Sequence, residues 1–186
     1  LEEIPAVFEI PNTVLSDILN PSLRPKIEVF DIGIFITLKL MQYQDKTDQV
    51  GVENLSLIVS ENTLISFREE AGPVFEPVRE RIRKYNNKIR TSGSDYLAFA
   101  LLDVVVDNYI YIMGILGDKI ESLDEKMTID PRKELLDEIN IYKREVNFLR
   151  KSILPAKEMI LALAKSDSDF LSDKNRLHFR ELQYNI

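Results

Sequence analysis

The stretch SDYLAFALLDVVVDNYIYIMGILGDKIESL, residues 94–123, is the longest apolar run in the chain. Its length suits a membrane span, which needs roughly 20 apolar residues. Asp103 and Asp107 lie near its middle, and each ionised Asp costs about 2.5 to 3.5 kcal/mol at the centre of a bilayer. We therefore predict a helix that is apolar on nearly every side and packs inside the protein. Gly114 and Gly117 are expected to permit close packing there or to break the helix.

Length and composition describe one globular domain, or one domain with an added lobe. The chain has 186 residues, of which 45% are hydrophobic and 30% are charged, enough to bury a core. A formal net charge of -7 argues against general nucleic-acid binding and favours cationic partners, metal ions included. The absence of cysteine excludes disulfides, thiolate metal sites and cysteine nucleophiles.

The residues after the apolar run predict a second long helix beside it. Asp130 and Pro131 are a typical N-cap and first helical residue. Apolar residues then recur at alternating steps of four and three: Leu135, Ile139, Tyr142, Val146, Leu149 and Ile153. This spacing of a seven-residue repeat indicates a helix packed along the 94–123 helix. Pro155 lies inside the pattern, where we expect a kink rather than an end.

A last helix is predicted from Ser172, after a loop at 166–169, and it carries His178 and Glu181. Because this helix runs off the chain at Ile186, we expect the chain to be a fragment of a longer protein. The only histidine, His178, has no nucleophile beside it and is interpreted as a surface residue. The six glycines are scattered, so no phosphate-binding loop is present. We expect no enzyme.

The N-terminal half predicts a sheet. Residues 26–44 are rich in β-branched and aromatic side chains and are expected to form two strands, broken near Asp31 and Gly33. Two further strands at 52–60 and 63–68 are expected to form a hairpin. These strands would make an antiparallel or mixed sheet.

Two shorter helices complete the expected elements. The first covers 12–20, with Asn12 as N-cap. The other opens at Glu76, with a proline next to it, and runs to about Arg90. Its many basic residues are interpreted as a solvated or acid-pairing face.

Asp103 and Asp107 are four residues apart, so they share a helix face and repel each other by a few tenths of a kcal/mol. If buried, each needs a cation, a hydrogen-bond donor, a raised pKa or a metal ion. Arg79 or Arg83 would serve as structural partners. Alternatively, a site of carboxylates alone would select a hard cation, Mg²⁺ or Ca²⁺.

Asp17 lies in the last turn of the first predicted helix, where it faces the negative end of the helix dipole. Its position is unfavourable unless a cation offsets it. We interpret it as a solvated acid relieved by Arg24 or Lys26.

Three blocks of sequence resemble the cytoplasmic domain of the CorA family of magnesium channels. They are VLSDILNPSLRPKIE at 14–28, VFEPVRERIR at 74–83 and DYLAFALLDVVVDNY at 95–109. The resemblance implies a homopentamer with an α/β domain, two long packed helices and a stalk helix that leads to two transmembrane helices. It places this chain on the cytoplasmic side of the inner (plasma) membrane.

The expected fold class is therefore α+β. An N-terminal antiparallel or mixed sheet packed with helices (1–92), lacking its earliest strands, is followed by a lobe of long antiparallel helices (93–171). Residues 172–186 would begin the stalk helix.

The resemblance also implies that regulatory Mg²⁺ binds between neighbouring subunits and holds the channel closed. The family's main regulatory acid falls on Asp17, and its partner on the next subunit's stalk falls on Glu181, where the best-known member has Asp. A secondary site includes Asp103. Ser16 stands where that second site would have another acid.

Two other functions stay open. One is a zinc or other divalent-cation transporter of the same superfamily. The other is a non-catalytic soluble helical scaffold whose acids are structural.

Overall fold

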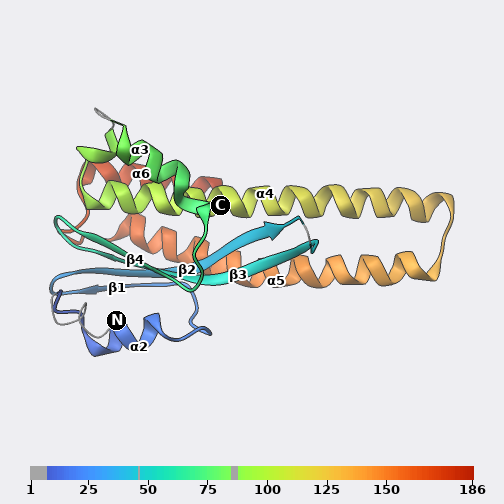
Figure 1. Cartoon of the computed structure of the whole chain (residues 1–186), viewed down its shortest axis with the longest axis horizontal. Helices are drawn as coiled ribbons and strands as arrows, with labels where there is room; N and C mark the ends of the chain where they lie inside the picture. Colours follow the sequence, from blue (N-terminus) through green and yellow to red (C-terminus); the bar gives the residue numbers. More distant parts are fainter. Residues whose placement is uncertain (1–7, 46, 85–87) are drawn as a thin grey trace.

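The computed structural model describes residues 8–45, 47–84 and 88–186 (Figure 1). Its elements, in chain order, are α2 (Asn12–Ile18), β1 (Lys26–Phe30), β2 (Gly33–Gln44), β3 (Gln49–Val59), β4 (Leu64–Arg68), η1 (Pro73–Phe75), α3 (Glu76–Arg83), η2 (Lys88–Arg90), α4 (Ser94–Ile129), α5 (Lys133–Lys165) and α6 (Asp173–Asn185). A sheet followed by long helices confirms the predicted α+β class.

The described strands form one antiparallel sheet in the order β1-β2-β3-β4. Its central pair, β2 and β3, runs from Ile34 opposite Val59 to Gln44 opposite Gln49. Both strands are rich in the β-branched and aliphatic residues that favour a packed, pleated surface. The chain turns between β1 and β2 at Asp31 and Ile32, which confirms the predicted break.

Helices cover both faces of the sheet (Figure 1). On one face, Val14 of α2 is fully buried against Phe35 and Ile58. On the opposite face, Ile36 and Leu57 belong to the larger core, which the long helices complete. The sheet therefore lies between α2 and the long helices, so a residue on α2 is separated from residues on α6.

The two long helices run antiparallel and project past the sheet (Figure 1). α4 has 36 residues and α5 has 33, which makes each about 50 Å long at 1.5 Å per residue. Leu149 and Ile160 of α5 are fully buried in the core shared with α4, which confirms the pairing predicted from the seven-residue repeat. α5 continues through Pro155. Residues 120–141, the outer turns of both helices, are called the helical arm below.

α4 is long and apolar enough to span a membrane by length and composition, with a mean hydropathy of 1.7 in its most apolar 18-residue window. Within that window, 44% of the residues are buried inside the fold. Leu102 and Val105 are fully buried in the core against the sheet, as the core-helix interpretation requires. The outer side of the helix is exposed at Ile110 and Tyr111, so α4 is not covered on every side within this chain.

Several predicted helix ends were wrong. Asn12 is the first helical residue, and the preceding Pro11 stands at the N-cap without a side-chain hydrogen bond. Asp130 directly follows the last residue of α4, Ile129, and α5 begins only at Lys133 with Arg132 at its N-cap. Asp130 therefore does not cap α5, and its carboxylate pairs with Arg132 instead.

Three further boundaries or packing roles differ from the predictions. The basic helix ends at Arg83, since Lys84 is extended, and residues 85–87 lie outside the described residues. β3 begins at Gln49, three residues earlier than expected. Gly114 and Gly117 are exposed on an unbroken α4, and a Cβ added to either would meet nothing within 4 Å, so neither mediates close packing within this chain.

Candidate metal-binding residues and their surroundings

Asp17 lies at the end of α2, beside two groups from the start of the sheet. The Lys26 ammonium is 2.6 Å from an Asp17 carboxylate oxygen and 2.8 Å from a Glu28 oxygen. Hydrogen bonds to these two carboxylates hold the pKa of Lys26 above its usual value. The prediction that Lys26 relieves Asp17 is confirmed, and two carboxylates already converge on one positive charge there.

Glu181 lies on α6 with 73% of its side chain exposed. Its carboxylate is 3.5 Å from Nδ1 of His178. On its other side, His178 Nε2 is 3.0 Å from the Lys88 ammonium, and the ring stacks on Phe99 at 4.9 Å between centroids. Reading His178 as an unpartnered surface residue was wrong, because its partners come from η2 and α4, far away in the sequence.

Asp103 is half-buried on α4. Burial raises the pKa of its carboxyl, the neighbouring Asp107 raises it further, and Arg81 partly offsets both. The expected partners Arg79 and Arg83 were wrong, because both pair with Glu76 at the start of their own helix. Among the described residues, no cation lies within 4.0 Å of the Asp103 carboxylate. Asp103 is therefore a partly buried acid without a direct ion pair, and Arg81 acts on it from a longer distance.

Replacing Asp103 by Asn is expected to raise the free energy of unfolding by about 0.5 kcal/mol at pH 7, a small gain because the group is partly hydrated. A carboxyl whose pKa is raised by folding binds more protons in the folded state, so the contribution of Asp103 to wild-type stability falls as pH rises above about 4 through the folded pKa. The variant should lack this fall. Urea unfolding at several pH values measures it.

The exposed Asp107 supplies the matched control, because Asp107→Asn removes the repulsion but not the burial and should stabilise less. A loss of stability in the Asp103 variant would instead show that this carboxylate makes a favourable contact with Arg81.

The candidate ligands do not meet within one chain. Asp17 belongs to the α2 side of the sheet, whereas Asp103 and Glu181 lie on the helices of the opposite side (Figure 1). Within residues 8–45, 47–84 and 88–186, no group of three or more Asp, Glu, His or Cys side chains is placed to hold a metal ion. Any site that joins Asp17 to Glu181 must therefore use a second subunit.

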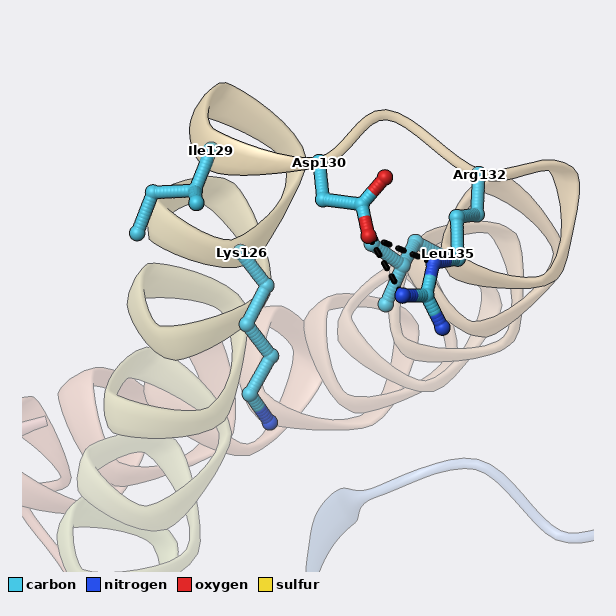
Figure 2. Close-up of a pocket in the computed structure, with 5 residues that line it drawn as sticks. All are labelled: Lys126, Ile129, Asp130, Arg132 and Leu135. Atoms are coloured by element: carbon cyan, nitrogen blue, oxygen red, sulfur yellow. Dashed lines mark hydrogen bonds and ion pairs between the residues drawn. The ribbon is translucent and has the colours of Figure 1, made fainter.

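A pocket of about 270 Å³ lies at the tip of the helical arm, lined by Lys126, Ile129, Asp130, Arg132 and Leu135. Figure 2 shows the Arg132 guanidinium directed at the Asp130 carboxylate, with Nε 2.7 Å from the nearer oxygen. Lys126 and Arg132 make the lining net positive. The pocket is thus unsuited to a divalent cation.

Comparisons with known proteins identify the family. The family model described as CorA-like Mg²⁺ transporter protein matches residues 1–186. The chain belongs to this family. This confirms the resemblance seen in the three sequence blocks, and the family is one of transporters rather than enzymes.

One relative is similar to the chain in sequence, and two solved structures are similar to it in fold. The cobalt/magnesium transport protein CorA of Thermotoga maritima is 35% identical over 98% of this CorA-family chain and 52% of its own length. The soluble domain of CorA from Methanocaldococcus jannaschii superposes with a TM-score of 0.84 at 18% identity, covering 100% of this chain and 73% of that one. The ZntB cytoplasmic domain from Vibrio parahaemolyticus gives 0.79 at 12% identity, covering 99% and 72%. The chain spans about half the length of the curated CorA relatives it matches.

Sequence reasoning missed the main role of Asp95 in this CorA-family chain. Asp95 lies in the first turn of α4, is 5% exposed and binds the start of α6. Its carboxylate accepts hydrogen bonds from the Ser172 backbone N–H at 2.9 Å, the Ser172 hydroxyl at 2.8 Å and the Asn175 amide at 2.9 Å. A negative charge at a helix N-terminus is favourable, so Asp95 fixes α6, and with it Glu181, to the base of α4.

Proposed function

We propose that this chain is the cytoplasmic regulatory domain of a homopentameric Mg²⁺ channel of the inner membrane, in which divalent cations bound between subunits gate transport. The observation that carries this proposal is the placement of Asp17 and Glu181. Both carboxylates reach the surface, and the sheet lies between them. Such a pair can bind one ion only across a contact between neighbouring subunits.

Electrostatics supply the mechanism. Bringing acids of neighbouring subunits together is repulsive, and a divalent cation between Asp17 of one subunit and Glu181 of the next converts the repulsion into attraction. Carboxylate oxygens are the ligands that Mg²⁺ prefers. Without the metal ion, the Lys26 ammonium neutralises Asp17. The metal ion either replaces Lys26 beside this carboxylate or binds the carboxylate together with it. When free Mg²⁺ falls, the bridge is lost and the population shifts toward the conducting state.

α6 is the beginning of the stalk in this proposal. A groove of about 400 Å³ lies beside the last turn of α6, between α4 and α5. Ile110, Met113 and Leu154, which line it, are each between 41% and 51% exposed. This exposed apolar surface beside α6 supports the assignment of α6 to the stalk.

The similarity to ZntB makes zinc the second candidate ion. Zinc sites in proteins favour cysteine and histidine ligands. The chain has no cysteine and a single histidine, so the carboxylates favour the harder Mg²⁺.

Cross-linking in the full-length protein tests the pairing of subunits. We expect the variant with both Asp17→Cys and Glu181→Cys, treated with a short bis-maleimide, to give a ladder of up to five covalently joined chains. A cross-linker is needed because a bridging cation holds the two Cα atoms farther apart than the roughly 7 Å limit of a disulfide. The 186 residues contribute no other cysteine.

The matched control pairs Asp17→Cys with Glu125→Cys, which is exposed on the arm and should give no ladder beyond dimers. A ladder in the control of the same length, or monomers alone in the test variant, would refute the proposed contact between Asp17 and Glu181.

A further inference from the structure

Four side chains meet where the turn between β2 and β3 touches the long helices. The Asp48 carboxylate accepts hydrogen bonds from the Tyr43 hydroxyl and from the Lys119 ammonium of α4. The second oxygen of the Asp48 carboxylate accepts a hydrogen bond from the Tyr142 hydroxyl of α5 at 3.3 Å. Lys119 also donates to the Tyr43 oxygen at 2.6 Å. One carboxylate at the hairpin turn therefore binds both long helices.

The Lys119 ammonium lies between two aromatic rings. Its distance to the Tyr43 ring centroid is 5.2 Å, and its distance to the Tyr142 ring centroid is 5.6 Å. Each contact is within the range of a cation–π interaction, which strengthens as the charge loses water. The Lys119 side chain is only 28% exposed. The Asp48 side chain is 51% exposed, so the ion pair alone would contribute little to stability, and the two ring contacts and the tyrosine hydroxyls distinguish the cluster from an ordinary surface ion pair.

The backbone conformation of Asp48 and the protonation state of Tyr142 both favour the contacts of the cluster. Asp48 has a φ of 58°, a left-handed conformation that Asp and Asn adopt more readily than other non-glycine residues. Its N–H bonds to the Gln44 carbonyl at 2.9 Å, which closes the turn. The Tyr142 hydroxyl is a donor at neutral pH, as in any tyrosine, and burial together with the Asp48 charge raises its pKa further.

The cluster lies at the base of the helical arm. The hairpin ends partway along α4 and α5, and the helical arm continues past it (Figure 1). Lys119 and Tyr142 are the residues next to the two ends of the arm, residues 120–141. The cluster is thus the outermost polar attachment between sheet and helices among the described residues.

We propose that Asp48, Tyr43, Lys119 and Tyr142 form a clasp that fixes the helical arm to the sheet. Lys119 is its central residue, because its ammonium contacts the other three side chains. With the clasp closed, the sheet and the arm move as one body. With it open, the arm swings on the inner turns of α4 and α5 while the core stays folded. This inference is independent of the proposed cation site.

Hydrogen exchange on the intact chain, read by mass spectrometry, tests the clasp. Lys119→Met keeps much of the side-chain length but removes the charge, and it should speed exchange in the arm by about fivefold while amides of β2 keep their protection. Asp48→Asn preserves the left-handed turn and should match that increase. Lys119→Arg retains the charge and the ring contacts, so it should stay close to wild type.

Lys126→Met is the matched control, since Lys126 is exposed on the same helix seven residues farther along. Combining Lys119→Met with Asp48→Asn should add little to either single change, because both break the same contact. Arm exchange in Lys119→Met no faster than in the Lys126→Met control would overturn the clasp. So would equal acceleration of β2 amides in both Lys119→Met and Asp48→Asn, which would indicate general destabilisation.

Discussion

Replacing Asp95 by Ala is expected to lower the free energy of unfolding by about 3 kcal/mol, because the change leaves buried donors without an acceptor. The lost bonds join Ser172 and Asn175 to the base of α4. For a chain of this size, such a loss corresponds to a melting temperature about 10 °C lower. Thermal and urea unfolding, followed by circular dichroism, measure it.

Two variants bracket this effect. Ser172→Ala removes only the hydroxyl donor and should cost about 1 kcal/mol. Asp107→Ala removes an acid exposed on the same helix and should change stability by no more than about 0.5 kcal/mol. If Asp95→Ala is no worse than Asp107→Ala, the carboxylate does not hold α6 in place.

Much of the fold could be predicted because its signals are local. The apolar run 94–123 and the seven-residue repeat that follows Asp130 identify two long packed helices, since side chains three and four residues apart share a helix face. Alternating apolar residues identify the strands in the same way. Helix ends were less predictable: Asp130 was expected to cap the second helix but pairs with Arg132, a competing contact two residues away.

The candidate site was predictable only where its partners are close in sequence. Lys26 lies nine residues after Asp17, in the segment that follows the same helix, and their ion pair was foreseen. Asp95 and Ser172 are 77 residues apart, and no local pattern connects them. Arg79 was predicted to pair with Asp103 on charge alone. It pairs instead with Glu76, which lies three residues earlier on the same helix.

In the full-length protein, changing Asp17→Asn together with Glu181→Gln is expected to remove protection from proteolysis by Mg²⁺. The amides keep nearly the size of the carboxylates but lose the charge that binds a hard cation. A bound ion stabilises the closed assembly by RT ln(1 + [Mg²⁺]/Kd), so weaker binding shifts protection to higher Mg²⁺ concentrations. Each lost carboxylate should raise the Mg²⁺ concentration needed for half protection by about tenfold, equivalent to about 1.4 kcal/mol.

The controls separate the bridge from general surface charge. Glu125→Gln with Asp124→Asn removes the same number of charges from exposed positions on the arm and should leave the Mg²⁺ response unchanged. Each single variant, Asp17→Asn or Glu181→Gln, should fall between wild type and the double variant. Equal loss in the arm control would assign the response to overall charge.

The most direct measurement is the fraction of full-length protein left uncleaved by a protease as Mg²⁺ is titrated, in wild type and in the Asp17→Asn, Glu181→Gln double variant. We predict that wild-type protection rises with Mg²⁺ and that the double variant stays cleavable at concentrations that protect wild type fully. Protection of the double variant at the same Mg²⁺ concentration as wild type would contradict the binding of a regulatory ion between these two carboxylates.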